Sequence, residues 1–241
     1  MSDFLEGWEG SQLILVVLAH PDDPEFFLGA TIARWTHLGH RVSYCLLTRG
    51  DKGASDPRVD PVELGQRREK EERAAAAVLG VTDVRFLEFG DGCLSPTLEA
   101  REAVTRVIRD VRPDILVTCD PLNYFPSDHN INHPDHRTAG QIVVDAAFPG
   151  AGSPMYYPEM IQEGLKPHSV KEVWLSLTAQ PNTVIDVTEH WSTRIRALHE
   201  HVSQIPDYQK LDERQRNRRT PDSTAEHPRY EEKFKRIQFL P

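Results

Sequence analysis

The stretch Leu13–Glu25 reads LILVVLAHPDDPE and decides the fold class. Its first half, Leu13–Leu18, is an unbroken apolar run that is typical of a buried strand. The polar half then places an imidazole and adjacent carboxylates at the end of that strand, where α/β proteins carry their chemistry. The stretch therefore predicts an α/β fold with a functional site after its first strand.

Strand-like and helix-like patterns alternate along the rest of the chain. We predict strands at residues 13–18, 41–48, 84–89, 115–119, 173–177 and 183–187, and helices at 25–38, 62–79, 98–111, 138–148 and 188–203. Repeated β-then-α units favour right-handed crossovers and parallel strands. The sequence thus predicts a single Rossmann-like α/β domain, with a mostly parallel, twisted sheet flanked by helices on both faces.

The end of the chain differs in composition from this domain. Residues 210–229 are heavily charged and punctuated by proline. We therefore assign residues 1–208 to the domain and residues 209–241 to a charged C-terminal extension. Such a segment is either partly disordered or ordered by packing on the domain or on a neighbouring subunit.

Composition limits the partners of the chain. Its 241 residues include 28 Lys and Arg against 37 Asp and Glu, for a net charge of −9. Nucleic-acid binders need a basic face, so we expect no nucleic-acid partner. We find no signal peptide and no apolar run long enough to span a membrane. The three cysteines are scattered and form no CxxC motif, which fits a reducing, cytoplasmic location.

A second polar cluster, His133-Pro134-Asp135-His136, follows the apolar run Ile115–Cys119. One His-Pro-Asp tripeptide is more often a structural turn than a ligand site. Two such clusters, each with a further candidate ligand, favour the two halves of one divalent-metal site. A catalytic zinc ion takes three protein ligands, so some of these side chains must act outside the ligand set.

The two clusters resemble the paired motifs of the PIG-L/LmbE family of zinc-dependent N-acetylglucosaminyl deacetylases. The AHPDDxE motif matches Ala19–Glu25, and the HPDH motif matches His133–His136. Arg68–Glu71 resembles the R-x-x-E helix of the family, and His201–Gln204 resembles its H-x-S-Q motif. The resemblance covers about residues 12–208. It implies the chemistry of the family but specifies no substrate.

The resemblance implies a ligand set of His20, Asp23 and His136. The implied cofactor is Zn²⁺, although Fe²⁺ or Co²⁺ also suits nitrogen and oxygen ligands. It further implies small-molecule partners, N-acyl amino sugars or glycosides. Members of the family often form trimers or hexamers, so a homo-oligomer is expected.

The same resemblance assigns the catalytic residues. Asp22 matches the general base, which takes a proton from the attacking water. His133 matches the residue that stabilises the tetrahedral intermediate or protonates the leaving amine. Asp135 matches the carboxylate that orients His133, and a nearby carboxylate favours the protonated imidazole. No Ser or Cys nucleophile is required.

Other site positions follow less directly. By resemblance, Arg68 and Asp91 contact sugar hydroxyls, and the position of Arg49 after the second strand favours a further substrate contact over a solvated turn. Glu25 either supports a metal ligand or interacts with its own helix dipole. Some related enzymes carry a tyrosine where this chain has Ile131, so Tyr124, Tyr156 and Tyr157 are alternative sources of oxyanion stabilisation.

The sequence thus predicts a metal-dependent hydrolase that removes an N-acetyl group from an amino sugar of the N-acetylglucosamine type, or from its conjugate. Two alternatives stay open. One is a related amide or carbamoyl hydrolase with a non-sugar substrate, and the other is a sugar-binding homologue without turnover. A nucleotide-binding Rossmann protein is disfavoured because no GxGxxG motif follows the first strand.

Overall fold

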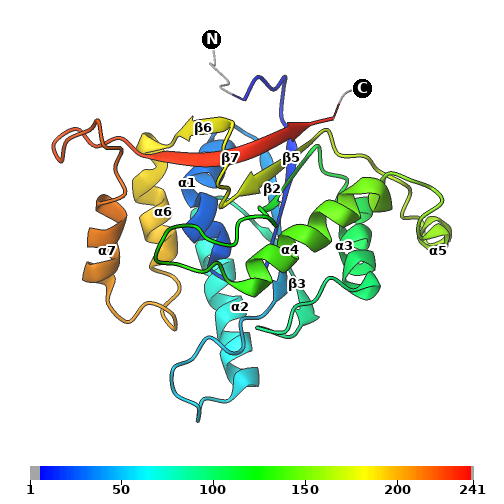
Figure 1. Ribbon diagram of the computed structural model, residues 1–241, viewed down its shortest axis with the longest axis horizontal. Coiled ribbons are helices and arrows are strands. Elements are labelled where there is room, and N and C mark those ends of the chain that lie inside the picture. Colours follow the sequence, from blue (N-terminus) through cyan, green and yellow to red (C-terminus); the bar gives the residue numbers. More distant parts are fainter. Residues whose placement is uncertain (1–5, 240–241) are drawn as a thin grey trace.

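One sheet organises the computed structural model, which describes residues 6–239 (Figure 1). Its strand order is β3-β2-β1-β4-β5-β7-β6. The first five strands run parallel: β1 (Leu13–Leu18), β2 (Arg41–Thr48), β3 (Asp83–Phe89), β4 (Ile115–Cys119) and β5 (Glu172–Ser176). Strand β7 (Glu231–Gln238) lies antiparallel between β5 and β6 (Thr183–Asp186). The predicted mostly parallel sheet is confirmed.

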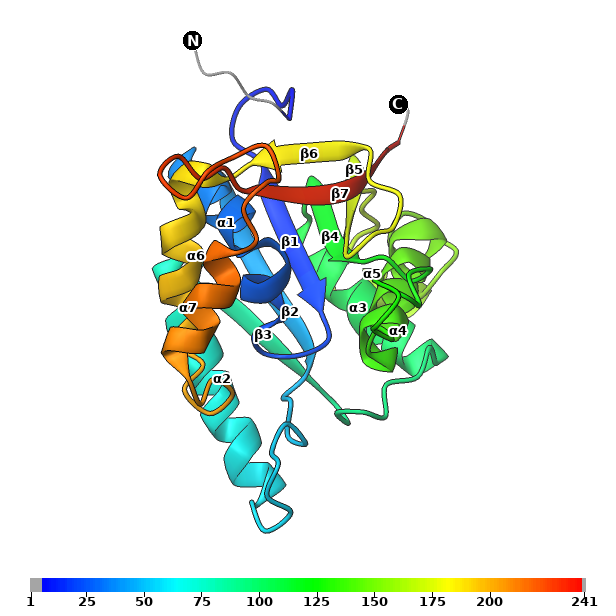
Figure 2. The ribbon, with the colours of Figure 1, turned by 60° about the vertical axis from the view of Figure 1, so that its left-hand side comes forward.

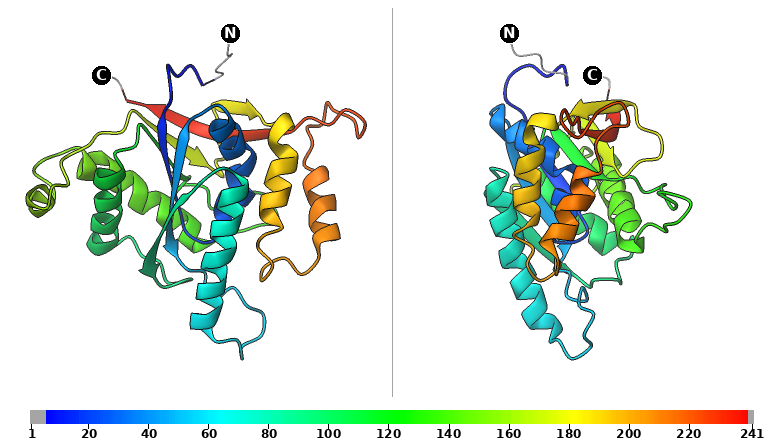
Figure 3. Two further views of the ribbon diagram at one scale, coloured as in Figure 1. Left: turned by 180° about the vertical axis from the view of Figure 1, so that it is seen from behind. Right: turned by 90° about the vertical axis from the view of Figure 1, so that its left-hand side faces the viewer.

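Two apolar cores lie on the two faces of this sheet. Successive residues of a strand point to opposite faces. Ile14 and Val16 accordingly belong to one core, and Leu15 and Val17 belong to the other. The first core is closed by α1 (Asp23–His37), α2 (Pro61–Val78) and α6 (Trp191–Leu198), and the second by α3 (Leu98–Val111) and α4 (Pro134–Asp145) (Figures 2 and 3).

The direction of the crossovers changes at β1. Strands β2 and β3 extend the sheet on one side of β1, whereas β4 and β5 extend it on the other. In open α/β sheets, such a switch point creates a crevice outside the carboxyl ends of the two central strands. The turn after β1 and the loop after β4 meet at this crevice, and they carry the two polar clusters.

Several helix boundaries differ from the predicted ones. Helix α4 begins at Pro134, because proline is well tolerated in a first helical turn. A 3₁₀ turn at Thr188–His190 precedes α6, which ends at Leu198 rather than near residue 203. Short helices also occur at Ala146–Ala151, which is a π-helix, at Pro158–Gln162 (α5) and at Tyr208–Arg216 (α7).

The C-terminal segment packs on the rest of the chain, one of the two arrangements considered for it. Its strand β7 pairs with both β5 and β6, so Glu231–Gln238 forms part of the central sheet. Two charged residues of this strand have partners elsewhere in the fold. Buried Glu232 accepts the backbone N–H groups of Ala30 and Thr31, and Arg236 Nη2 lies 2.6 Å from Glu172 Oε1.

Cys45 and Cys119 are buried free thiols, and Cys93 is exposed. Within residues 6–239, no helix combines the length and the apolar character needed to cross a bilayer.

Candidate active site

The first polar cluster forms the turn from β1 into α1. The backbone N–H of His20 donates to Asp23 Oδ2 over 2.8 Å and ties the turn together. Asp22 precedes α1 with a φ of 85°, in the left-handed region that residues with a Cβ rarely adopt. Its carboxylate makes no capping hydrogen bond to α1. It lies instead 3.2 Å from Nη2 of Arg68.

The second cluster forms the start of α4. The backbone N–H of Asp135 donates to Nδ1 of His133 over 3.2 Å, so His133 caps the helix. Because Nδ1 accepts, the neutral imidazole carries its proton on Nε2. His136 lies one turn further along, and its Nδ1 is 3.1 Å from Oδ1 of Asn132.

The structure brings these two clusters together, although they are far apart in the sequence. Nε2 of His136 lies 3.1 Å from Oδ1 of Asp23. One ring nitrogen each of His20, His133 and His136 lies within 4.8 Å of the others. Imidazoles and a carboxylate therefore converge on one small volume at the carboxyl ends of β1 and β4.

A layer of carboxylates surrounds His20. Its Nε2 lies 3.1 Å from Oδ1 of Asp91 and 3.3 Å from Oδ2 of Asp135, and both aspartates are buried. The backbone N–H groups of Lys52 and Gly92 donate to these two carboxylates over 2.9 and 2.7 Å. Because ionised carboxylates only accept, Nε2 of His20 carries a proton, and Nδ1 is the nitrogen left to bind a cation once its own proton is released.

These donors fit a divalent cation. Nδ1 of His20 is 3.5 Å from Oδ2 of Asp23. In both predicted ligand histidines, His20 and His136, one ring nitrogen lies against an acceptor oxygen, as is usual for metal-binding imidazoles. Such nitrogen and oxygen donors suit Zn²⁺, Fe²⁺ or Co²⁺. His20, His133 and His136 form one group of donors, and Asp23 contacts both His20 and His136. The predicted set remains a prediction.

The electrostatics of Asp22 suit a base. Burial and the neighbouring Asp23 carboxylate together raise the pKa of its carboxyl group to about 6, against the opposing effect of the Arg68 guanidinium. A general base works best when its pKa lies near the operating pH. The environment of Asp22 therefore matches the predicted role.

The pKa of His20 is also raised, and for an imidazole this favours the charged form. Burial by itself would lower its pKa, but hydrogen bonds to Asp135, Asp23 and Asp91 raise the pKa of His20 to about 12. In the absence of a cation the imidazole is thus protonated, and metal binding must release that proton.

Asp135 contacts His20 and His133 through different groups. The Asp135 carboxylate lies beside His20 and accepts from Gly92, whereas only its backbone N–H contacts His133 among the hydrogen bonds of the described residues. Burial, together with His20 and His136, lowers the pKa of His133 and outweighs the opposing effect of Asp135. These contacts favour the neutral form of His133, and its catalytic role remains a prediction.

The predicted substrate residues occupy different environments. Arg68 is 4% exposed, and its guanidinium donates to the carbonyls of Gly50 and Pro21 over 2.8 and 2.7 Å. Arg49 is more exposed and forms ion pairs with Glu69 and Glu88. Asp91, described above, lies beside His20. Their contacts with a substrate remain predictions.

Sequence reasoning missed a third cluster of polar residues, which lies beside Asp22. Glu25, Glu72 and His201 are fully buried, and Oε2 of Glu25 lies 3.2 Å from Nε2 of His201. Glu25 thus contacts His201 rather than a predicted metal ligand. The signals were present as Glu25 of the first motif and His201 of the H-x-S-Q motif, but nothing in the sequence paired them.

The alternative tyrosines lie in two places. Tyr124 belongs to the loop that precedes His133, where Ile131 is 78% exposed and Arg137 stacks on the Tyr124 ring. The backbone carbonyls of Tyr156 and Tyr157 accept hydrogen bonds from Arg109, which lies in the last turn of α3. This turn leads into the amino end of β4, whereas the candidate site lies at the carboxyl end. Only Tyr124 of these three is on the segment next to the site.

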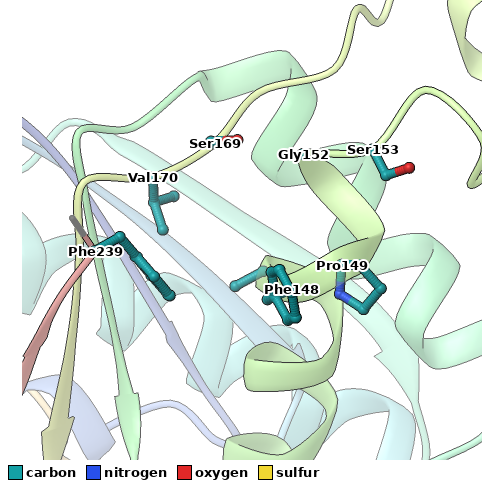
Figure 4. A pocket seen from close by; sticks show the side chains of 8 residues that line it. Phe148, Pro149, Gly152, Ser153, Ser169, Val170 and Phe239 are labelled. Atoms are coloured by element: carbon teal, nitrogen blue, oxygen red, sulfur yellow. The ribbon is translucent and has the colours of Figure 1, made fainter. Parts of the chain in front are cut away.

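An apolar cavity of about 370 Å³ lies apart from these clusters (Figure 4). It is formed by the π-helix and the segments around Val170 and Phe239. None of its eight lining residues carries a carboxylate or an imidazole. This cavity therefore offers no group for acid–base or metal chemistry.

The fold and the imidazole–carboxylate cluster define an α/β protein with a candidate metal-dependent catalytic centre. Comparison with known families identifies it further. Residues 15–147 match the PIG-L family, described as GlcNAc-PI de-N-acetylase, and the chain belongs to this family of deacetylases. The predicted family membership is confirmed.

Individual relatives agree with this assignment. The chain is 38% identical to the diacetylchitobiose deacetylase of Thermococcus kodakarensis, over 80% of this chain and 70% of that protein. It is 32% identical to the 1D-myo-inositol 2-acetamido-2-deoxy-alpha-D-glucopyranoside deacetylase of Thermobispora bispora, over 80% and 79% of the two chains. The structure of N,N'-diacetylchitobiose deacetylase from Pyrococcus horikoshii superposes with a TM-score of 0.85 at 28% identity, covering 98% and 89%.

Proposed function

We propose that this chain is a zinc-dependent hydrolase that removes the N-acetyl group from an amino sugar of the N-acetylglucosamine type, or from its conjugate. One observation carries the proposal: the turn after β1 and the start of α4 bring two imidazoles and one carboxylate together beside a separate carboxylate, Asp22. The relatives named above are deacetylases of N-acetylated amino sugars, which supports the same substrate class.

The ligand residues in this proposal are His20, Asp23 and His136. A divalent cation held by them would polarise the acetyl carbonyl and acidify water. Asp22 accepts the proton of the attacking water, since its pKa of about 6 leaves it ionised at neutral pH. The Asp22 carboxylate then returns this proton toward the departing amine. No protein nucleophile takes part.

His133 acts on the other side of the reaction. Its Nδ1 is bound to the backbone N–H of Asp135, so Nε2–H donates a hydrogen bond to the oxyanion of the tetrahedral intermediate. Asp135 serves this step through its backbone N–H, which donates to Nδ1 of His133, and its carboxylate holds His20. Arg49, Asp91 and Arg68 are proposed to contact the sugar. For buried Arg68 this requires that ligand binding exposes its guanidinium.

The decisive experiment is a substrate screen with metal-reconstituted protein. The purified chain is stripped with chelator, reloaded with Zn²⁺, Fe²⁺ or Co²⁺, and incubated with N-acetylglucosamine glycosides and with simple non-sugar amides and carbamoyl compounds. Acetate and free amine are measured. Stoichiometric release from the glycosides, lost on stripping and regained on reloading, is expected. Release only from non-sugar amides would favour the alternative hydrolase, and binding without release would favour a non-catalytic homologue.

Two further predictions remain open beside the reaction. A homo-oligomer, trimer or hexamer, would be recognised by the molar mass in light scattering. A cytoplasmic location would be recognised by fractionation of the producing cells.

A further inference from the structure

The cluster beside Asp22 is unusually enclosed. Glu25 from α1, Glu72 from α2 and His201 after α6 are each 0% exposed. Nε2 of His201 lies 3.2 Å from Oε2 of Glu25 and 3.9 Å from Oε2 of Glu72. Burying carboxylates is unfavourable unless they are paired or hydrogen-bonded. Their contacts outside the cluster therefore indicate what the cluster holds in place.

One such contact reaches Asp22. The backbone N–H of Asp22 donates to Oε2 of Glu72 over 2.8 Å. Asp22 has the left-handed backbone described above, which is unfavourable for a residue with a Cβ and persists only when surrounding contacts enforce it. Its own side chain makes no capping hydrogen bond that would enforce it.

Helix α2 holds the peptide unit between Pro21 and Asp22 at both of its polar atoms. Nη2 of Arg68 donates to the carbonyl of Pro21 over 2.7 Å, while Glu72 accepts from the N–H of Asp22. Arg68 and Glu72 are four residues apart and so lie on one face of α2. Because a peptide unit is planar, fixing its carbonyl and its N–H fixes the rotation of the whole plane. That rotation sets φ of Asp22.

We propose that Glu72 is a positioning residue for Asp22. Together with Arg68 it fixes the peptide plane before Asp22, and this directs the Asp22 carboxylate away from α1 and toward the site. Glu25 and His201 hold the Glu72 carboxylate in turn. The inference rests on the proposed function in one respect: the direction of the carboxylate matters for turnover only if Asp22 is the base.

The test uses substitutions that preserve volume. Glu72→Met removes the acceptor for the Asp22 N–H, and Glu72→Gln restores an acceptor oxygen. Glu71→Met is the matched control, because Glu71 is the adjacent buried carboxylate of α2 and accepts hydrogen bonds from the N–H and hydroxyl of Ser203 instead.

In metal-loaded protein, Glu72→Met lowers kcat by about 10- to 100-fold, the range expected for a slightly misplaced catalytic group, with KM and metal content unchanged. Glu72→Gln regains most of kcat, and Glu71→Met stays close to wild type.

A second readout needs no turnover. Hydrogen exchange of the Asp22 amide is measured by NMR in metal-free protein, and slow exchange is expected in wild type and Glu72→Gln but fast exchange in Glu72→Met. If the wild type deacetylates nothing while this pattern holds, the proposed function fails and the positioning stands. Wild-type kcat in Glu72→Met, an equal loss in Glu71→Met, or fast exchange of the Asp22 amide in folded wild type would each overturn the inference. The last outcome remains decisive even if Glu72→Met does not fold.

Discussion

Two histidines of this molecule each lie among carboxylates, yet their surroundings differ. His20 contacts Asp91 and Asp135 through Nε2, its Nδ1 is 3.5 Å from a third carboxylate, and one of its ring nitrogens lies within 4.8 Å of those of two further imidazoles. His201 contacts Glu25 and Glu72 in full burial, and its Nδ1 has no hydrogen-bond partner among residues 6–239.

The difference separates a site from its support. A ligand imidazole needs one nitrogen bound to an acceptor and the other directed at converging donors, which His20 has. Glu25, Glu72 and His201 are fully buried and contact the backbone of Asp22 through Glu72. We call these three residues the closed cluster, and the donors around His20 and His136 the open cluster. The open cluster is suited to bind and react, and the closed cluster is suited to hold the open cluster in place.

The largest expected effect falls on the residue between the two clusters. Asp22→Asn removes the proton acceptor while it keeps the shape of the side chain, so turnover falls by about 10²- to 10⁴-fold. The metal content, measured by elemental analysis, stays at the wild-type level. Asp56→Asn, which changes an exposed aspartate, is the control. Near-normal turnover in Asp22→Asn would remove Asp22 from the role of base.

Metal affinity tests whether the open cluster holds the cation. His136→Ala removes a predicted ligand, so metal affinity falls by more than the roughly 10- to 100-fold that outer contacts of a ligand contribute. His129→Ala, an exposed loop histidine, leaves the affinity unchanged. Competition with a chelator of known affinity measures both. Full affinity in His136→Ala would show that the predicted ligand set is wrong.

The closed cluster is expected to respond in stability instead. His201→Ala leaves two buried carboxylates without their imidazole, and breaking a buried pair costs about 3–5 kcal/mol. Urea unfolding of the metal-free protein measures this loss, and the folded variant still binds metal with wild-type affinity. A variant that kept its stability but lost its metal would place His201 in the open cluster.

Asp91 offers a smaller and more selective test. Asp91→Asn weakens the hydrogen bond that orients His20, so metal affinity falls by about 10- to 100-fold. If Asp91 contacts the sugar, as the family resemblance implies, KM rises while metal affinity stays constant. Chelator competition and steady-state kinetics on the same preparation distinguish the two roles.

The central sheet could be predicted closely because its signals are local. Leu13–Leu18, Arg41–Thr48 and Ile115–Cys119 are apolar or β-rich runs with clear boundaries, and the structure has strands at the same residues. Strand β7 escaped prediction because its buried face alternates Glu232 with Phe234 between charged residues. The partners that make Glu232 tolerable, the N–H groups at the middle of α1, are far away in the sequence.

The candidate site divides in the same way. His20, Asp22 and Asp23 are adjacent in the sequence, so one turn places them together. Glu72 looks like an ordinary helical glutamate among several, and its contact with Asp22 depends on how α2 packs beside the β1–α1 turn. Pairings of this kind arise from tertiary packing, to which residue spacing within one segment gives no access.

The smallest expected effect concerns pH and sharpens the contrast within the open cluster. Burial raises the pKa of Asp22 to about 6, whereas His20 and the backbone N–H of Lys52 outweigh burial at Asp91 and lower its pKa to about 2. An NMR titration of the side-chain carboxyl carbons in metal-free protein should therefore show the Asp22 signal changing near pH 6 and Asp91 remaining ionised.

The same pKa predicts the pH dependence of turnover. Below the Asp22 pKa the base is protonated, so kcat/KM falls by about tenfold per pH unit on the acid side. A bound cation favours the ionised carboxylate and moves this limb to lower pH. An Asp22 that titrates near 4 without metal would mean that its surroundings do not tune it as a base.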